Sequence, residues 1–192
     1  MTTLSLRCLW RGYFATLRRD YARNDKLDAR ATLAIWRLGQ TFHRQPGVVP
    51  FLLRRLSGVL DAVWIRGYMG AVLPPHVQAG PGLRLPHCAR GVVLHHTVRI
   101  GAEATIYHQV TIGVRDRRPA AAIIGNNVSI GAGAKILGPL TVGDNCHVGA
   151  NAVVITDVPS GASAVGVPAV IKMPKADERA ESEVVGRAGS LR

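Results

Sequence analysis

Residues 123–158 read IIGNNVSIGAGAKILGPLTVGDNCHVGANAVVITDV, and an aliphatic residue returns at every sixth position of this stretch. Glycine follows most of these residues, and small or polar residues fill the rest of each hexad. The recurring positions are Ile124, Ile130, Ile136, Val142, Val148 and Val154. A period of six fits neither an α-helix nor a plain alternating strand. It is typical of a chain that turns a corner every six residues, so that three sides close one triangular coil of about eighteen residues.

The hexad pattern also predicts where each side chain points. The aliphatic residue faces into the prism and stacks on its equivalent one coil away, while glycine and asparagine occupy corners that need positive φ or close backbone approach. We expect the repeat to start near Ala79-Gly80 and to end around Val158-Pro159. Residues 114–123 (VRDRRPAAAI) interrupt the repeat, which predicts a loop at one corner. Residues 161–173 are expected to form a closing strand.

Residues 1–70 have a different composition, with little glycine and much leucine, arginine and alanine. Apolar residues at three- and four-residue spacing predict amphipathic helices over residues 6–21, 28–43 and 49–68. The apolar side of the third predicted helix consists of Leu52, Leu53, Leu56, Leu60, Val63 and Trp64. The helices and the hexads together predict an α+β fold.

The length of 192 residues suits one domain with an appendage. We expect an N-terminal helical segment over 1–70, a β-helix over 71–173 and a disordered tail over 174–192. The formal net charge is +12, and residues 1–70 hold twelve Lys or Arg against four Asp or Glu. A basic surface attracts anionic partners. The interleaved aromatic and basic residues of single-strand binders are missing, so we expect no nucleic-acid partner.

Two basic pairs, Arg18-Arg19 and Arg54-Arg55, leave two interpretations open: a solvated helix face or a peripheral contact with a membrane surface. The three cysteines are far apart and odd in number, which argues against a disulfide framework or a paired metal motif. The N-terminus lacks an apolar core followed by a cleavage site, and no run approaches about 18 apolar residues. We therefore expect a cytoplasmic protein.

Four segments carry a resemblance to a known family: GPGLRLPH (80–87), IGAGAKILG (130–138), VGANAVV (148–154) and AVGVPAVI (164–171). Together they resemble the left-handed hexapeptide-repeat acyltransferases, and more narrowly the serine O-acetyltransferase group with its close relatives, the colanic-acid-type polysaccharide O-acetyltransferases. The resemblance implies a left-handed coil and a homotrimer or a dimer of trimers. It also implies acetyl-CoA as co-substrate, lying along the prism edge between neighbouring subunits.

Acetyl transfer to a hydroxyl needs a base, and histidine is the natural base near neutral pH. The resemblance places the catalytic histidine at His87. It places a basic substrate loop at Arg117 and Arg118, whose guanidinium groups could hold an acceptor carboxylate through paired hydrogen bonds or could simply be solvated. Residues expected to bind the cofactor, through corner backbone or a lysine ammonium group, are Gly113, Gly131, Ala132, Lys135, Ala150 and Lys172.

The sequence departs from the family pattern around this histidine. Serine acetyltransferases carry an aspartate directly before it, where this chain has Pro86. A second aspartate, which orients the histidine, is missing from the matching stretch 72–75, and Asp61 is the nearest carboxylate upstream. The loop reads Asp-Arg-Arg-Pro over 116–119 in place of Asp-Arg-His-Pro. These changes affect acceptor recognition more than the class of reaction.

The leading interpretation is an acetyl-CoA-dependent O-acetyltransferase acting on a small hydroxyl acceptor, with L-serine as the acceptor that the resemblance implies. One alternative is acetylation of a polysaccharide or a sugar precursor. Another, of a different class, is a non-catalytic trimeric scaffold whose basic helical cap binds a membrane or a partner. His95, His96, His108 and His147 raise a zinc alternative, because solenoid carbonic anhydrases bind zinc through three histidines, but we expect no metal.

Overall fold

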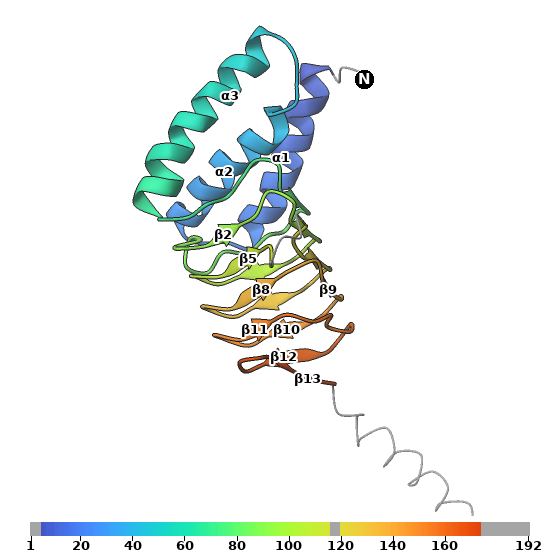
Figure 1. The fold of residues 1–192 in the computed structure, drawn as a ribbon. Coiled ribbons are helices and arrows are strands. Elements are labelled where there is room, and N and C mark those ends of the chain that lie inside the picture. Colours follow the sequence, from blue (N-terminus) through green and yellow to red (C-terminus); the bar gives the residue numbers. More distant parts are fainter. Residues whose placement is uncertain (1–4, 116–119, 174–192) are drawn as a thin grey trace, which may run out of the picture.

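The computed structural model describes residues 5–115 and 120–173, and shows a helical cap seated on one end of a parallel β-helix (Figure 1). The helical cap consists of α1 (Leu6–Ala22), α2 (Leu27–Phe42), α3 (Val48–Leu60) and a π-helix, η1 (Asp61–Tyr68), that continues α3. Ser5 caps α1, since its hydroxyl accepts a hydrogen bond from the Cys8 N–H. All three helices predicted from the sequence are present, and the α+β class is confirmed.

The β-helix is built from strands of two or three residues that stack into three sheets. The strands are β1 (Gln78–Ala79), β2 (Val93–Leu94), β3 (Arg99–Ile100), β4 (Thr105–Ile106), β5 (Thr111–Gly113), β6 (Ile123–Ile124), β7 (Ser129–Ile130), β8 (Lys135–Leu137), β9 (Thr141–Val142), β10 (His147–Val148), β11 (Val153–Val154), β12 (Ser163–Val165) and β13 (Val170–Lys172). The sheet orders are β1-β3-β6-β9, β13-β12-β10-β7-β4 and β11-β8-β5-β2. Each coil visits the three sheets in turn, as a six-residue period requires.

The core of the solenoid is the predicted stack of aliphatic side chains. Ile124 pairs with Ile100 on one side and with Val142 on the other, and these three residues are at most 5% exposed. Equivalent rows run through the other two sheets, so the core is one continuous column. The inward orientation that the hexads predict is confirmed.

The corners of the prism contain residues in the left-handed region of φ. One corner carries Glu103, Asn127 and Asn145 at φ between 53° and 61°, and the Asn127 side-chain amide donates to the Asn145 Oδ1 at 2.9 Å. Asparagine tolerates this conformation better than most residues because its short polar side chain bonds locally. Glycine is required at position 131 for a different reason, the close approach of the coils: a Cβ on Gly131 would lie 2.6 Å from the Ala150 nitrogen in the next coil.

The far end of the solenoid closes with a hairpin. Residues 161–173, expected to form one closing strand, contain β12 and an antiparallel partner, β13, that pairs Ser163 with Lys172. Val167-Pro168, a cis peptide, lies in the turn between them. The predicted tail lies outside the described residues.

The third helix differs from the usual rule that the apolar side of an amphipathic helix faces a core. Leu52, Leu56 and Val63 are 51–68% exposed. The side of α3 that meets α2 instead presents buried Pro50 and Ser57 and half-buried Leu53. Three of the six residues predicted on the apolar side therefore lie on the outer side of the helix, and the other three, Leu53, Leu60 and Trp64, are half-buried. The spacing identified an apolar stripe correctly, but only the packing of α2 decides which stripe is covered.

Candidate active site

His87 lies at the corner between the second and third sheets, in a turn that is longer than its equivalents. Arg84 is level with Thr105, and Val93 with Thr111, so this corner holds three more residues than the same corner of the next coil. Cys88 and Ala89 adopt φ of 61° and 64°, and the Arg90 N–H closes the turn on the His87 carbonyl at 3.1 Å. The His87 side chain is exposed, so the longer turn presents the imidazole on the outer edge of the prism.

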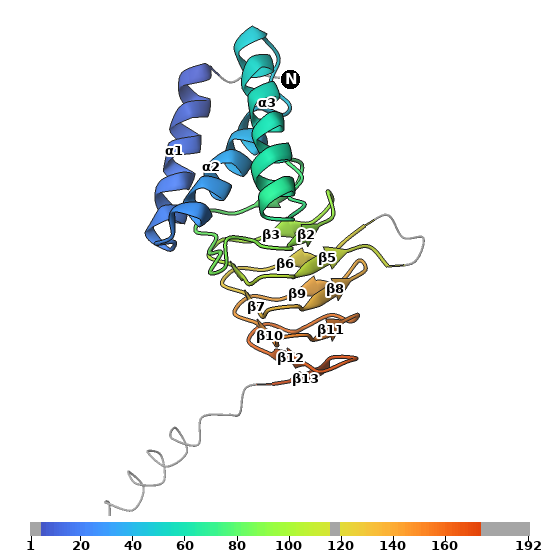
Figure 2. The ribbon, with the colours of Figure 1, turned by 90° about the vertical axis from the view of Figure 1, so that its left-hand side faces the viewer.

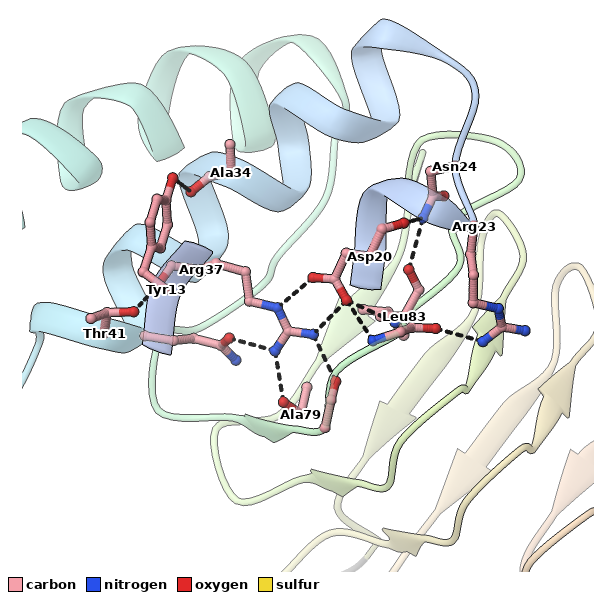
Figure 3. A network of polar contacts seen from close by, with 12 residues as sticks. Tyr13, Asp20, Arg23, Asn24, Ala34, Arg37, Thr41, Ala79 and Leu83 are labelled. Carbon is pink, nitrogen blue, oxygen red and sulfur yellow. Dashed lines mark hydrogen bonds and ion pairs between the residues drawn. The ribbon is translucent and has the colours of Figure 1, made fainter. Parts of the chain in front are cut away.

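The helical cap holds the coil that leads into this turn (Figure 3). Asp20 of α1 is fully buried, and its Oδ1 accepts hydrogen bonds from the backbone N–H groups of Gly82 and Leu83 at 2.8 and 2.9 Å. Asn24 continues the pattern, since its amide donates to the Leu83 carbonyl and its Oδ1 accepts from the Leu85 N–H, both at 2.8 Å. The backbone two residues before His87 is therefore fixed from the cap.

Arg37 of α2 completes this junction. Its guanidinium group is 4% exposed, pairs with Asp20 at 2.9 Å, and donates to the carbonyl groups of Ala79 and Gly80. A buried ion pair is tolerated only when further hydrogen bonds satisfy both partners, and here the backbone of the first coil supplies them. We call Asp20, Asn24 and Arg37 the junction network.

Cys88 faces the cap rather than the solvent. Burial, followed by a hydrogen bond from its thiol to Asp28 of α2, raises the pKa of Cys88 to about 11. A thiol with that pKa is almost entirely protonated near neutral pH, and the thiolate is the nucleophilic form. Cys88 therefore has a packing role beside His87.

Two rings of the following coil lie against His87. The His108 ring meets it edge-to-face at 4.7 Å between centroids, and Tyr107 lies at 6.0 Å. The His108 Nδ1 is buried and has no hydrogen-bond partner among the described residues. These two rings restrict the space into which the His87 imidazole can rotate.

The same edge continues down the prism through small residues. The Gly133 N–H bonds the His108 carbonyl, and the Asn151 N–H bonds the Ala132 carbonyl, so consecutive coils bring these corners into one row. Gly131, Ala132 and Ala150, three of the residues expected to bind the cofactor, lie on this row below His87 and His108. The row has no long side chains at these positions, so its backbone is accessible along the edge.

The remaining residues expected to bind the cofactor lie elsewhere. Gly113 and Lys135 belong to β5 and β8 of the adjoining third sheet. The Lys135 ammonium group already donates to the Gln109 carbonyl at 2.8 Å and to the Thr111 hydroxyl at 3.1 Å, which uses two of its three donors. Lys172 is exposed on β13, at the far end of the second sheet from His87.

Arg117 and Arg118 lie outside the described residues. The chain leaves β5 after Gly113 and re-enters the prism at Ile123, so the loop springs from the corner between the third and first sheets. His87 lies at a different corner. Within one chain, the two ends of the loop and the histidine are therefore on different edges of the prism.

The other histidines do not converge. His95 and His96 contact each other at 4.2 Å between ring centroids, and burial, then His96, lowers the pKa of His95. His147 is exposed on β10. Over residues 5–115 and 120–173, no group of three or more His, Cys, Asp or Glu side chains is placed to hold a metal ion.

The junction network is what sequence reasoning missed. Asp61, considered as a distant carboxylate for His87, instead pairs with Arg66 at 2.7 Å in the cap. The carboxylate that supports the histidine's coil is Asp20, and it acts on backbone rather than on the ring. In the sequence, Asp20 is a charged residue at a position where the apolar spacing of the first helix predicts a buried side chain. A charge at a buried position requires a partner.

Comparisons with known proteins identify the family. Residues 121–156 match the model described as "Bacterial transferase hexapeptide (six repeats)". The chain is 39% identical over 142 residues to a serine acetyltransferase of Helicobacter pylori strain J99, covering 71% of this chain and 77% of that protein. The chain belongs to the serine acetyltransferase family. As a member of this family of hexapeptide transferases it is an acyltransferase, and its β-helix is left-handed.

Solved serine acetyltransferases have the same fold. The enzyme of Neisseria gonorrhoeae, whose structure was determined in complex with serine, superposes with a TM-score of 0.65 at 29% identity over 85% of this chain and 69% of that one. The soybean apoenzyme gives a TM-score of 0.66 at 30% identity over 85% and 68%. In the described part of this chain, no helix is long and apolar enough to span a bilayer.

Proposed function

We propose that this chain transfers the acetyl group of acetyl-CoA to the hydroxyl of L-serine, with His87 as the general base. Its similarity to the Helicobacter pylori serine acetyltransferase supports the reaction. The Neisseria gonorrhoeae relative, solved with serine, supports the acceptor. The observation that carries the assignment of His87 is its exposed position on a corner that the junction network holds in place.

His87 removes the hydroxyl proton as the oxygen attacks the thioester carbonyl, and the proton later goes to the departing thiolate of coenzyme A. The carbonyl–sulfur bond breaks and the ester bond forms, so no oxidant or metal is needed. Contact with the His108 ring limits the directions in which the His87 nitrogen can point. The neighbouring Cys88 thiol is buried against the cap, and its pKa is raised to about 11, which supports direct acetyl transfer rather than a route through a cysteine thioester.

Acetyl-CoA fits the edge that runs from His87 through Ala132 to Ala150. A pantetheine arm needs close approach to backbone groups, and the small residues of this row allow it. Gly131 shows how tightly the coils approach, since it has no room for a Cβ. We place Gly131, Ala132 and Ala150 along the arm, and Gly113 and Lys135 on the adjoining sheet. Lys172 is the most distant of the group and suits only the nucleotide end.

A complete site needs more than one copy of the chain. His87 is on one corner of the prism, and the loop that holds Arg117 and Arg118 springs from another. A trimer packed around a common axis brings the loop of one copy towards the histidine corner of the next. We therefore propose a homotrimer in which Arg117 and Arg118 serve the neighbouring copy's acceptor.

One observation favours a second candidate function, acetylation of a sugar hydroxyl in a polysaccharide or its precursor. Pro86 precedes His87 where serine acetyltransferases carry the aspartate that helps bind the amino acid. Within the described ranges, no carboxylate makes a hydrogen bond to His87, and Asp61 is engaged by Arg66. An amino acid's ammonium group therefore lacks the partner that it has in the family pattern.

The test is an acceptor panel. Purified protein is given acetyl-CoA with L-serine, other small hydroxy compounds or nucleotide-activated sugars, and released thiol is followed. We expect turnover with L-serine to exceed every other acceptor, and His87→Ala to lose it. Turnover with a sugar and none with serine would replace the serine assignment by the second candidate. No thiol release with any acceptor would contradict both.

A further inference from the structure

The outer face of α3 and η1 carries a continuous row of exposed aliphatic side chains. All are 45–75% exposed and recur at three- and four-residue spacing, so they share one side of the helix. They are Val48, Val49, Leu52, Leu56, Val59 and Val63, and we call them the outer stripe. Figure 2 shows α3 in front of the cap, and no other helix or strand of residues 5–115 and 120–173 covers it.

The cap does not need the outer stripe for its own packing. Leu53, on the opposite side of α3, packs on the small core formed by Leu9, Leu38 and Phe42. Trp64 of η1 packs on the main core and donates its indole N–H to the Thr32 hydroxyl at 3.0 Å. Exposed aliphatic surface is unfavourable in water, and contiguous apolar patches on soluble proteins commonly mark interaction sites.

One border of the stripe is positively charged. Arg55, three positions after Leu52 and four before Val59, places its guanidinium carbon 5.2 Å from the centre of the Phe51 ring, whereas Arg54 lies on the side of α3 that meets α2 and donates to the His43 carbonyl at 3.4 Å. Arg66, on η1, is also exposed, and pairs with Asp61, the only acidic residue between positions 48 and 68. An aliphatic row bordered by arginine is the composition of a helix that lies in the interface of an anionic bilayer.

A second copy of the chain is a poorer occupant. A two-fold contact through this stripe would oppose two arginine borders, and each copy already has a net charge of +12. Like charges brought together at the edge of an apolar contact repel each other. Lipid phosphate groups instead supply the opposite charge along the whole helix.

We propose that the outer stripe docks this protein onto an anionic lipid bilayer, with α3 lying in the plane of the membrane surface. The aliphatic side chains enter the boundary between headgroups and acyl chains, and Arg55 and Arg66 meet lipid phosphates. The proposal does not depend on the acceptor that the active site takes. It concerns peripheral binding and requires no membrane-spanning segment.

Vesicle flotation of the full chain tests this directly. We expect the protein to float with vesicles that contain phosphatidylglycerol and to stay behind with vesicles of phosphatidylcholine alone, and added salt should weaken binding. Val59→Asp removes one aliphatic anchor and adds a repelled charge, so partitioning should fall by about tenfold or more. Val170→Asp is the matched control, because Val59 and Val170 are both 62% exposed and Val170 lies on the solenoid.

Thiol release with soluble substrates checks that both variants remain folded, and it should be unchanged in both. Equal vesicle binding by wild type and Val59→Asp would overturn the proposal. So would a wild type that ignores phosphatidylglycerol vesicles. If light scattering then shows an assembly that Val59→Asp splits and Val170→Asp leaves intact, the stripe is an interface between copies of the chain instead.

Discussion

In the solenoid, Ile124 is 2% exposed and its neighbour Ile123 is 48% exposed, as the hexad pattern requires. In the helical cap, Val59 of α3 and Val63 of η1 are 62% and 68% exposed although both are aliphatic. The difference comes from the source of each residue's neighbours. A hexad residue packs on its own equivalents one coil away, whereas a helix packs on whatever element folds against it. Repetition therefore predicts burial, and helical spacing predicts only which residues share a side.

The junction between the two regions adds a second kind of contact to the apolar packing that holds the solenoid together. The aliphatic column of the solenoid continues into the cap through Leu33, Trp36 and Ile65, and the junction network adds a buried carboxylate and a buried guanidinium group that bind the first coil. Apolar contacts depend little on direction. Hydrogen bonds to the Gly82 and Leu83 backbone depend strongly on direction, so they fix the position of the first coil relative to the cap. The coil that leads to His87 is held by the more directional of the two.

The largest effect is expected at the junction. Asp20→Asn leaves the Arg37 guanidinium buried without its ionic partner, and breaking a buried pair from one side typically costs about 3–5 kcal/mol. Chemical denaturation of the variant should show that loss, while Asp25→Asn, at an exposed position, should unfold like wild type. A loss under about 1 kcal/mol would mean that the junction is not held by this pair.

A smaller but well-controlled effect is expected inside the prism. Ile124→Ala empties part of the aliphatic column and should destabilise by about 2–5 kcal/mol. Ile123→Ala removes the same atoms from the adjacent, half-exposed position and should cost much less. The denaturation midpoints of the two variants give the comparison. Similar losses would refute the inward stacking of every sixth residue.

Little change in stability is expected on the outer stripe. Val59→Ala should alter the free energy of unfolding by no more than about 0.5 kcal/mol, because the side chain is 62% exposed. Val142→Ala, at a fully buried position, provides the contrast and should destabilise clearly. If Val59→Ala lowers the unfolding midpoint as much as Val142→Ala does, the stripe is covered in the folded protein.

The smallest expected effect concerns the rates at which the three cysteine thiols react. Cys8 is exposed, whereas Cys88 and Cys146 are buried and burial raises the pKa of both thiols. At pH 8 a maleimide should label one cysteine per native chain rapidly and the other two at least about tenfold more slowly. Mass spectrometry of the labelled peptides identifies the site. Rapid labelling of Cys88 would show that the turn at His87 is not packed against the cap.

Much of the fold could be predicted because the six-residue repeat determines both the corners of the prism and the positions that face inward. The positions of β3 to β11, the interruption before Ile123 and the helices of the cap all follow from spacing. The orientation of α3 could not, since it depends on α2. Nor could the junction network, because the partners Asp20 and Gly82 are 62 residues apart. The assignment of His87 as the base comes from family resemblance and stays a prediction, whereas its longer turn and its contact with His108 required coordinates.

The central claim is that His87, presented on a rigid corner of the prism, is the base of the acetyl transfer. The most direct measurement is the turnover number of His87→Ala, with His147→Ala as a control at another exposed histidine. We predict that His87→Ala lowers turnover by about 10²–10⁴-fold with an unchanged unfolding midpoint, and that His147→Ala remains close to wild type. Full turnover in a folded His87→Ala protein would contradict the account.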